Sequence, residues 1–423
     1  MRVGDAVRVG DAVPVGDGLR VAVICDYSLG YLGGAQTALL QEAAALAAAG
    51  VTVLLLSPST EEIWERVRPA GGIEHVRIRS GFTLPGLGLP VVVNSRRLRA
   101  RIAGILADRR IQVVHLQSEF GLAAAAVAAA SGMGLPVVHT VHTFFWQAPP
   151  RGQRLLAPAV RRFHRLVTGM PPASAELADR PADSALRNMT LTIARRADLV
   201  LSGSAHQADR LRQAGLDSVA VLPNTVSRVR DAAVLTSADG PLKLIWIGRC
   251  VPEKRILVFV RAVVAAIDQL GPGAIEATVV GDGPQLDEAR AIAAGRPGIS
   301  FLGRQNHDQV TALLTASQLA VLTSYGFDNQ PMTVVEAVMA LRGVLYCDPA
   351  LQEGLDGPGI LAPPDEAGLT SALVGLARDP APVIAASRAA ATTRETFSPD
   401  HHAAELIRAY RKLITGDDGR GIR

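Results

Sequence analysis

Short apolar runs alternate along the chain with longer stretches in which apolar residues recur at helical spacing. The first run, 19–26 (LRVAVICD), is followed by a glycine loop at 31–34 and by an alanine-rich helical stretch. Alternation of this kind is typical of βαβ units, whose strands form one parallel sheet. The other runs of the first half that predict strands are 51–57, 111–117, 135–142, 197–204 and 218–224.

The alternation stops at 225–241, which is polar and without a pattern, and then begins again. Two rounds of this pattern are too long for one hydrophobic core, whereas 423 residues suit two domains of about 200 residues each. The predicted fold is therefore α/β, with two Rossmann-like doubly wound domains facing a cleft. The strand-like runs of the second round are 242–248, 277–283, 299–303, 318–324 and 343–348.

The domain boundaries follow from the same pattern. We expect an N-terminal domain over 19–224, a linker over 225–241 and a C-terminal domain over 242–397. A helix over 398–415 has apolar residues at helical spacing, so it is expected to cap a core. The segment 143–190 is rich in proline and arginine and breaks the alternation. We therefore interpret it as a surface elaboration of the first domain.

The composition is that of a globular protein, with 48% apolar and 19% charged residues. No stretch of about 20 strongly apolar residues predicts a membrane span. The repeats within 1–18 lack the apolar segment of a signal peptide and are interpreted as a disordered tail, and 416–423 as a flexible end. Cys25, Cys250 and Cys347 lack metal-ligand spacing and are expected to be buried hydrophobic residues of a cytoplasmic protein. The net charge of +4 is modest, so no nucleic-acid partner is expected.

Several motifs fall at the carboxyl ends of predicted strands, where ligands bind in open parallel sheets. Gly33 and Gly34 follow the first strand, and such small residues let a backbone approach a phosphate or a sugar beside a helix N-terminus. A tight turn without a ligand is the alternative. The dinucleotide fingerprint G-x-G-x-x-G is absent, which disfavours a nicotinamide-binding domain.

The stretch 248–254 (GRCVPEK) also follows a predicted strand and carries two cations. Arg249, as a planar fork, and Lys254, as a point charge, can close on a diphosphate from two sides. The alternative is a solvated loop in which Lys254 pairs with Glu253. The expected folded body contains no D-x-D pair and no His/Cys cluster with metal spacing, so we predict no metal site.

Two carboxylates lie eight residues apart in the stretch 324–338 (SYGFDNQPMTVVEAV). Asp328 precedes the predicted helix, and Glu336 lies inside it among valines and alanines. Pro331 suits the first turn of a helix, with Gln330 or Asn329 as its cap, so that free N-H groups would face a ligand. A carboxylate in such apolar surroundings needs a partner. Sugar hydroxyls are suitable donors, and a salt bridge to a neighbouring arginine is the alternative.

Three histidines lie in predicted strands. His139 and His142 are three residues apart, so they point to opposite faces of a strand and are poor joint metal ligands. His142 ends its strand and can reach the cleft, whereas His139 is expected to be a core histidine with satisfied hydrogen bonds. His115, at the end of another strand, is a second candidate for the cleft.

The helix predicted over 95–109 combines an apolar stripe with arginines near its start. A basic amphipathic helix can lie on anionic lipid. Arginines at a helix start oppose the helix dipole, which favours an external anion as their partner. A solvated helix face is the alternative. The stripe is formed by Leu98, Ile102, Ile105 and Leu106, and the arginines are Arg96, Arg97, Arg99 and Arg101.

Taken in order, these motifs resemble those of the family 4 retaining glycosyltransferases, which have the GT-B fold. The resemblance covers about residues 20–415 and implies two Rossmann-like domains, with a nucleotide-sugar donor held mainly by the second and an acceptor held by the first. The stretches that carry it are GGAQ (33–36), TVHT (140–143), ADLVLSGSAHQADRLRQAG (197–215) with LPNTV (222–226), GRCVPEK (248–254), VVGDGP (279–284), FLG (301–303) and DNQPMTVVEAV (328–338).

The resemblance also implies roles for the two acids and their neighbours. Glu336 would bind the ribose of the donor. Asp328, with the amides of Asn329 and Gln330, would contact the transferred sugar. The first acid of this family is usually Glu, so Asp328 is a departure that bears on the choice of sugar.

Further roles implied by the resemblance concern the donor diphosphate and the reacting face of the sugar. Arg249 and Lys254 match the diphosphate clamp, and His142 matches the N-domain histidine near the reacting face. Arg255 stands where a glycine commonly follows the lysine. The glycines expected to contact the donor are Gly33, Gly34, Gly248 and Gly303.

The predicted function is transfer of a sugar, with retention, from a UDP- or GDP-hexose type of donor to an acceptor hydroxyl. No residue is an obvious nucleophile, and the resemblance favours a front-side mechanism without metal or cofactor, in which Arg249 and Lys254 would stabilise the leaving diphosphate. The acceptor is a small molecule, a glycan or a lipid-linked group, and the last would bring peripheral contact with an anionic membrane.

Two proteins of other classes would share the fold. The first alternative is a non-catalytic nucleotide-sugar or membrane-surface binding protein. The second is a pyridoxal phosphate phosphorylase, which needs a Schiff-base lysine in the second domain, where only Lys243 and Lys254 occur.

Overall fold

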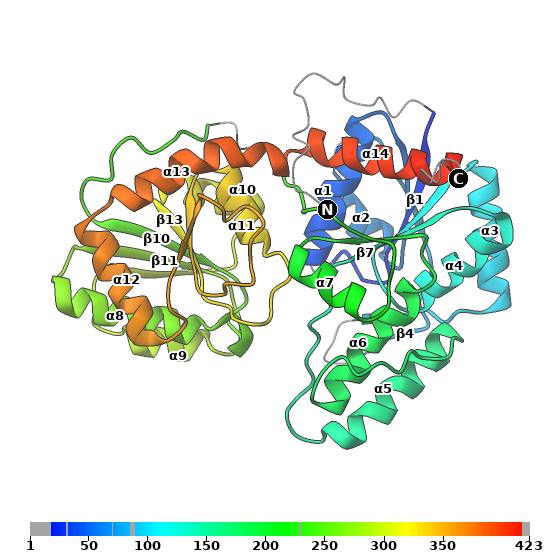
Figure 1. The fold of residues 1–423 in the computed structure, drawn as a ribbon, viewed down its shortest axis with the longest axis horizontal. Helices are drawn as coiled ribbons and strands as arrows, with labels where there is room; N and C mark the ends of the chain where they lie inside the picture. Colours follow the sequence, from blue (N-terminus) through cyan, green and yellow to red (C-terminus); the bar gives the residue numbers. More distant parts are fainter. Residues whose placement is uncertain are drawn as a thin grey trace, which may run out of the picture.

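The computed structural model describes residues 18–30, 33–69, 71–84, 89–227, 229 and 231–416. These residues form two α/β domains that lie side by side (Figure 1). The predicted α/β fold with two doubly wound domains is confirmed. Residues 1–17 of the predicted tail and 417–423 of the predicted flexible end lie outside the described residues.

The first domain is built on a sheet of seven parallel strands in the order β3-β2-β1-β6-β7-β8-β9. The order reverses beside β1, so that the carboxyl ends of β1 and β6 form a switch point, the usual place for a ligand in such sheets. The strands are β1 (Arg20–Ile24), β2 (Thr52–Ser57), β3 (Glu74–Arg77), β6 (Val113–Leu116), β7 (Val137–Val141), β8 (Leu199–Ser202) and β9 (Val219–Val221).

Helices cover both faces of this sheet, and β4 (Phe82–Leu84) and β5 (Leu89–Val91) form a separate antiparallel pair. Ala123, Ala124, Ala125 and Ala126 of α4 (Gly121–Met133) are fully buried, and their methyl side chains let the helix lie close to its neighbours. Gly121 begins this helix with no room for a Cβ atom, which would lie 1.9 Å from the carbonyl oxygen of Val92. The helices are α1 (Gly34–Ala48), α2 (Glu61–Val67), α3 (Arg96–Asp108), α4 (Gly121–Met133) and α7 (Ala205–Gln213).

The second domain has a parallel sheet of six strands in the order β12-β11-β10-β13-β14-β15, again with a reversal beside its first strand, β10. The sequence pattern missed β15 (Gly359–Leu361), which is three residues long and partly exposed. The other strands are β10 (Leu242–Ile247), β11 (Ile275–Val280), β12 (Ile299–Gly303), β13 (Leu319–Leu322) and β14 (Gly343–Tyr346). The helices are α8 (Ile256–Leu270), α9 (Leu286–Ala293), α10 (His307–Ala316), α11 (Met332–Met339), α12 (Glu366–Arg378) and α13 (Ala381–Thr393).

The last helix, α14 (Pro399–Thr415), crosses back and packs on the first domain (Figure 1). Its buried residues Leu406, Ile407 and Tyr410 belong to the same core cluster as β1, β2 and α1. The core that this helix caps is therefore that of the N-terminal domain, although the helix follows the C-terminal domain in sequence.

Segment 143–190 forms two helices, α5 (Gln153–Thr168) and α6 (Pro181–Ala194), which pack against each other at the outer end of the first domain (Figure 1). Its regular structure was not predicted, because Pro158 within α5 and the other prolines of the segment obscured the helical spacing. Helix α5 nevertheless ends only at Gly169, which has a left-handed conformation (φ +67°).

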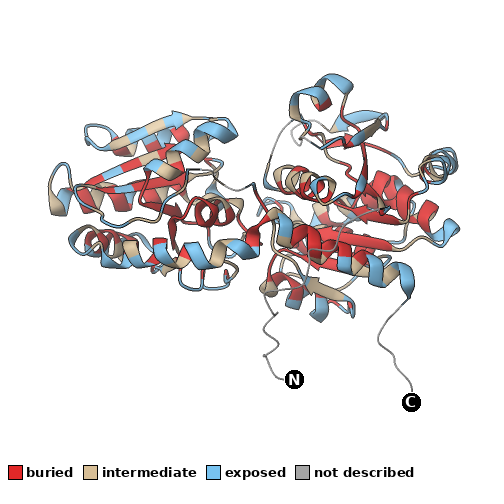
Figure 2. Ribbon diagram, turned by 90° about the horizontal axis from the view of Figure 1, so that it is seen from above, coloured by how far each residue is buried: buried red, intermediate tan, exposed pale blue. Residues whose placement is uncertain are grey.

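The central strands of both sheets are buried, and the exposed residues lie mainly on the edge strands and on the helices and loops around the sheets (Figure 2). Cys25, Cys250 and Cys347 are free and buried, as predicted. The apolar stripe of α3 is also buried: Ile102 and Leu106 lie fully inside the core, and Leu98 and Ile105 pack against it. The hypothesis that this stripe lies on anionic lipid is therefore wrong.

Candidate functional site

A cavity of about 480 Å³ opens between the two domains at the carboxyl ends of the strands of the second sheet. Gly33, Gly34 and Thr37, at the start of α1, line it from the first domain. The second domain contributes strand-end loops and α11, and the lining residues from that side include Gly248, Arg249, Lys254, Gly281, Asp282, Gly283, Arg304, Gln305 and Glu336. The cavity thus gathers motifs that lie as far as 300 residues apart.

Close backbone contacts shape the floor of this cavity. Gly281 has φ +140°, and a Cβ atom there would lie 1.8 Å from the carbonyl oxygen of Gly248. Only glycine lets these two strand ends pass each other. The Gly281 N-H donates to the carbonyl oxygen of Gly303 at 2.8 Å. Gly303 therefore supports the floor, while its neighbours Arg304 and Gln305 line the cavity.

The two cations occupy the loop between β10 and α8. Arg249 is exposed and lines the cavity. Lys254 does not pair with Glu253: its Nζ lies 2.5 Å from Oδ1 of Asp328, and both side chains are largely buried. The two motifs that carry Lys254 and Asp328 are thereby joined directly, which the sequence did not predict.

Arg255 has a left-handed backbone conformation (φ +54°), which explains why the family commonly has glycine at this position. Its guanidinium donates to the carbonyl oxygens of Thr323 and Pro364. These bonds offset the backbone strain, so the turn that positions Lys254 is preserved without the glycine.

Asp328 lies in the loop before α11, where its side chain is 9% exposed. Besides Lys254, its carboxylate accepts a short hydrogen bond from the hydroxyl of Ser324. Ser324 was not predicted as a site residue, although a hydroxyl just after β13 is the kind of residue that the position of ligands at strand ends would point to.

Glu336 lies on the face of α11 that lines the cavity. Burial raises the pKa of Glu336 to about 7. Among the described residues, no arginine or lysine forms an ion pair with it, so the predicted alternative of a salt bridge is wrong. Its carboxylate is available to a ligand.

Asn329 and Gln330 do not cap α11, which was the prediction. The helix begins at Met332 and is preceded by Pro331 in an extended conformation. The Asn329 side chain accepts a short hydrogen bond from the Ser204 hydroxyl and donates to the carbonyl oxygen of His142 at 3.1 Å. The Gln330 side-chain oxygen accepts from the N-H of Asn224 at 2.6 Å. Both side chains therefore hold the two domains together beside the cavity.

The predicted histidines have three different environments. His142 is half-buried at the end of β7, outside the lining of the cavity, and its Nε2 lies 2.7 Å from Oε1 of Gln117. Burial lowers the pKa of His142 to about 4, so its ring is neutral. His115 is fully buried against Tyr410 and Thr140, and its prediction as a cleft residue is wrong, because α14 covers it.

His139 is buried, as predicted, but its hydrogen bonds are not satisfied. Neither ring nitrogen has a partner in the part of the chain that the structure describes. Burial lowers its pKa, so the ring is neutral.

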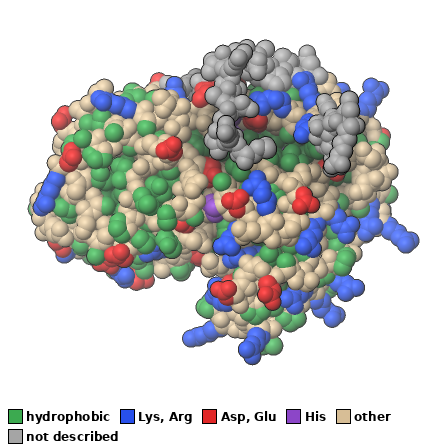
Figure 3. All heavy atoms as spheres, in the orientation of Figure 1, with side chains coloured by type: hydrophobic (Ala, Val, Ile, Leu, Met, Phe, Trp, Pro, Cys, Tyr) green, Lys and Arg blue, Asp and Glu red, His purple; other side chains and the backbone are tan. Residues whose placement is uncertain are grey.

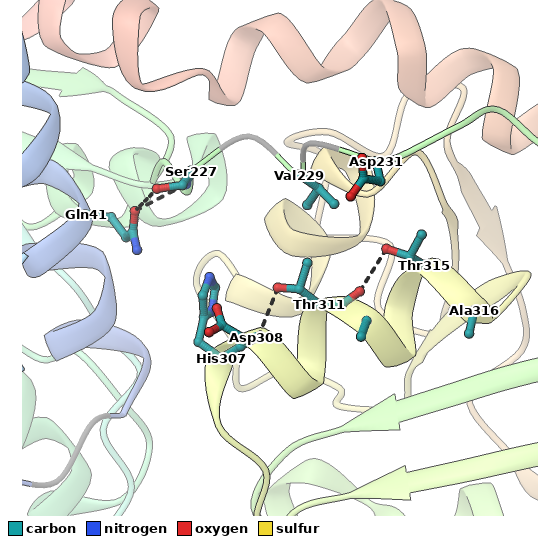
Figure 4. Close-up of a pocket in the computed structure, with 10 residues that line it drawn as sticks. Gln41, Ser227, Val229, Asp231, His307, Asp308, Thr311, Thr315 and Ala316 are labelled. Carbon is teal, nitrogen blue, oxygen red and sulfur yellow. Dashed lines mark hydrogen bonds between the residues drawn. The ribbon is translucent and has the colours of Figure 1, made fainter.

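A second, larger cavity of about 740 Å³ lies between α10 and the segment that joins the domains (Figure 4). A hydrogen bond between Ser227 and Gln41 of α1 crosses near it. His307, Asp308 and Asp231 also line it, but none of the predicted site residues does. We therefore place the candidate site in the smaller cavity.

The sequence model of Glycosyltransferase Family 4 matches residues 32–230, and that of Glycosyl transferases group 1 matches residues 241–379. The chain belongs to glycosyltransferase family 4. This family comprises retaining hexosyltransferases that use nucleotide sugars, so the enzyme class predicted from the motifs is confirmed.

Curated relatives of this glycosyltransferase act on different acceptors. The 2-deoxystreptamine glucosyltransferase of Streptomyces kanamyceticus is 26% identical over 72% of this chain and 78% of its own length. The glycogen synthase of Mycobacterium tuberculosis is 26% identical over 84% of each chain. The D-inositol 3-phosphate glycosyltransferase of Mycobacterium avium is 26% identical over 93% of this chain and 94% of its own.

Solved structures share the fold of this glycosyltransferase. Anabaena HepE, in complex with UDP-glucose, superposes with a TM-score of 0.64 at 16% identity and covers 94% of this chain and 100% of its own. The pneumococcal O-GlcNAc transferase GtfA, in complex with UDP and GlcNAc, has a TM-score of 0.66 at 11% identity, covering 94% and 99%.

Two further findings concern metal and membrane. Within the described ranges, no three His, Cys, Asp or Glu residues come together in a way that could hold a metal ion. In the same ranges, no helix of this glycosyltransferase is long and apolar enough to cross a membrane.

Proposed function

We propose that this enzyme transfers a hexosyl unit from a UDP- or GDP-hexose type of donor to an acceptor hydroxyl, with retention and by a front-side mechanism. The observation that carries the proposal is the convergence on one cavity of an unpaired carboxylate, Glu336, with two cations, Arg249 and Lys254. A nucleoside diphosphate has both complementary parts: ribose hydroxyls that donate to a carboxylate and phosphates that bind cations.

In this proposal each side chain has a distinct role. Glu336 accepts hydrogen bonds from the ribose, while Arg249 and Lys254 neutralise the diphosphate as it leaves. Asp328 fixes Lys254 before the donor binds and contacts the transferred sugar. Gly33, Gly34 and Gly248 bring backbone close to the phosphates, and the start of α1 favours their negative charge.

The two cations and the N-terminus of α1 can stabilise the leaving group without a metal, which is the mechanism that we propose. As the bond to the sugar breaks, negative charge develops on the diphosphate and positive charge on the sugar. The leaving phosphate oxygen then takes the proton of the acceptor hydroxyl, which attacks from the same face and gives retention.

UDP is the nucleotide that we propose to test first, because solved structures of HepE and of GtfA contain it. At 100 times its dissociation constant, a ligand adds about 2.7 kcal/mol to the stability of the folded state. We expect UDP or GDP to raise the melting temperature by several degrees in a thermal-shift screen that includes ADP and dTDP. If none of the four shifts the melting temperature, the proposed donor site is wrong.

The non-catalytic alternative is tested by following the release of UDP from UDP-sugars in the presence of a mixed acceptor pool. A transferase releases UDP faster with acceptors than without them. A binding protein would show the thermal shift but no release.

The outer face of α5 carries exposed leucines and arginines, and these bear on the class of acceptor. Leu155 and Leu166 are 80% and 65% exposed and fall on one face of the helix, because they are eleven residues apart. The helix contains no acidic residue, and arginines (blue) are prominent around the end of the molecule where it lies (Figure 3). The exposed arginines of α5 are Arg154, Arg161, Arg162 and Arg165.

We propose that this face of α5 rests on an anionic membrane, which would bring the enzyme to a lipid-linked acceptor. The leucines would enter the headgroup region, and each arginine adds about 1 kcal/mol of attraction to anionic lipid. We therefore assign the membrane contact to α5 and not to α3, whose apolar stripe is buried.

The membrane contact predicts co-sedimentation with vesicles of phosphatidylcholine and phosphatidylglycerol in equal parts, but not with phosphatidylcholine alone. The double variant Arg161→Gln/Arg162→Gln should weaken binding about tenfold or more. Arg378→Gln/Arg388→Gln, which changes two exposed arginines of the second domain, is the matched control. Equal sedimentation with both kinds of vesicle, or none with either, would contradict the proposal.

A further inference from the structure

A chain of buried polar side chains lies behind His142 and contains no residue that the sequence analysis selected for the site. Gln117, just after β6, is 2% exposed, and Glu42 of α1 and His402 of α14 are also buried. The His142 Nε2 lies 2.7 Å from the Gln117 Oε1, and the Gln117 Nε2 lies 2.7 Å from the Glu42 Oε1. The His402 Nε2 lies 3.2 Å from the other oxygen of Glu42.

The chemistry of these groups determines which atom donates and which accepts in each of these hydrogen bonds. Burial opposes ionisation of Glu42, but the nearby His115 and His402 more than offset it and lower the pKa of Glu42, so its carboxylate is ionised and can only accept. Gln117 must therefore turn its NH₂ group toward Glu42 and its oxygen toward His142. An amide oxygen cannot donate, so the Nε2 of His142 must carry the proton.

We propose that Gln117, oriented by Glu42, is a positioning residue that holds the His142 imidazole in one orientation and in the tautomer with its proton on Nε2. Nδ1 is then the only acceptor of the ring, so any ligand hydroxyl that meets it has to donate. The inference rests on the proposed function in one respect: His142 has to lie near the reacting sugar for the tautomer to affect turnover.

The last helix completes this array. His402 Nε2 faces one oxygen of Glu42, and its Nδ1 lies 2.8 Å from the carbonyl oxygen of Pro223. Both partners can only accept, so both ring nitrogens of His402 have to donate. Tyr410 of the same helix bonds to His115, which lies 3.3 Å from the other oxygen of Glu42. The return of α14 to the first domain thus fixes the carboxylate that orients Gln117.

The direct test is the tautomer of His142, read by ¹⁵N NMR of the full chain labelled at histidine, with the signal assigned by its loss in a His142→Ala variant. We expect Nε2–H in the wild type. Gln117→Met removes both amide contacts at similar volume, and it should give a mixture of tautomers. This readout requires no acceptor and no turnover, so it can fail independently of the proposed function.

Kinetics provide the second readout. Gln117→Met should lower the rate of donor turnover about 10- to 100-fold while leaving UDP affinity within about twofold. Gln207→Met is the matched control, because Gln207 is a buried glutamine of the same domain that bonds to Val141 and Ser202 but not to the His142 ring. Equal losses of donor turnover in both variants would show that Gln117 has only a structural role.

A charge variant keeps the proposal testable if Gln117→Met does not fold. The titratable groups around the His142 ring are Glu42 on α1, His115 on β6 and His139 on its own strand. Glu42→Gln removes the charge that fixes the Gln117 amide, so the amide can turn over and the NMR signals of His142 should show a mixture of tautomers. A proton on Nδ1 in the wild type, or the Nε2–H tautomer alone in Glu42→Gln, would overturn the proposal.

Discussion

Replacing Lys254 with methionine is expected to lower donor turnover about 10²- to 10³-fold. The physical reason is the loss of one of the two cations that face the leaving diphosphate, in a cavity where little water screens the charge. Methionine keeps most of the length and volume of the side chain. The measurement is the rate of nucleoside diphosphate release, together with UDP affinity by calorimetry.

Stability has to be separated from catalysis in this experiment, because Lys254 also pairs with Asp328 at 2.5 Å. Removing one partner leaves the other largely buried without its counter-charge, and we expect a loss of about 3–5 kcal/mol in the free energy of unfolding. The double variant Lys254→Met/Asp328→Asn removes both charges and should recover much of this stability while remaining inactive.

The control for charge alone is Lys243→Met. Lys243 is the other lysine of the second domain and is exposed on β10, away from the cavity. The Lys243→Met substitution should leave donor turnover unchanged. A double variant that regains wild-type turnover would show that Lys254 serves only to neutralise Asp328, and the proposed diphosphate contact would then be wrong.

Replacing Glu336 with glutamine is expected to weaken UDP binding about 10- to 100-fold, because hydrogen bonds to a charged acceptor contribute about 1.5–3 kcal/mol. The same substitution should stabilise the ligand-free protein at pH 8. Burial raises the pKa of Glu336 to about 7, so the folded state has to hold an unfavourable charge above that pH.

The sign of this pH effect can be derived from linkage. The usual pKa of this carboxyl is 4.5, so between pH 4.5 and about 7 the folded state binds more protons than the unfolded state. Stability therefore falls as pH rises through this window, by about 3 kcal/mol in total. Glu336→Gln should match the wild type near pH 4.5 and have the higher melting temperature at pH 8.

UDP binding should show the opposite trend, because the proposed ribose contact needs the ionised form of Glu336. Below about pH 7 the affinity of the wild type should fall relative to that of Glu336→Gln, which shares any titration of UDP itself. Glu276→Gln, which changes an exposed carboxylate on β11, is the control. Unchanged UDP affinity in Glu336→Gln at pH 8 would exclude the ribose contact.

Much of the candidate site could be predicted from strand ends. Parallel strands bring their carboxyl ends to one edge, so Gly33, Gly34 and Gly248 were expected to lie at such edges before any contact was known. A ligand contact of the helix that carries Glu336 could also be predicted from a local signal, since Glu336 is the only charge within a run of valines and alanines. These signals are local and survive without knowledge of the fold.

The errors have a common origin. His115 and His142 both end strands, and only the position of α14 decides that one is sealed in the core while the other remains half-buried. The apolar stripe of α3 was equally compatible with lipid or with a protein core, because amphipathicity indicates that a face is covered but not what covers it. Asn329 was a plausible cap, but in the structure its side-chain oxygen accepts a hydrogen bond from Ser204 of the other domain.

The sequence by itself determined two doubly wound domains and the edges at which a ligand binds, because the spacing of apolar residues sets local backbone structure and burial. The tertiary structure alone decided that Lys254 meets Asp328, that α14 returns to the first domain, and that Glu42 and Gln117 lie behind His142. Each of these contacts joins side chains that are far apart in the sequence and that meet only because of how whole helices and strands pack. A local sequence pattern therefore cannot predict them.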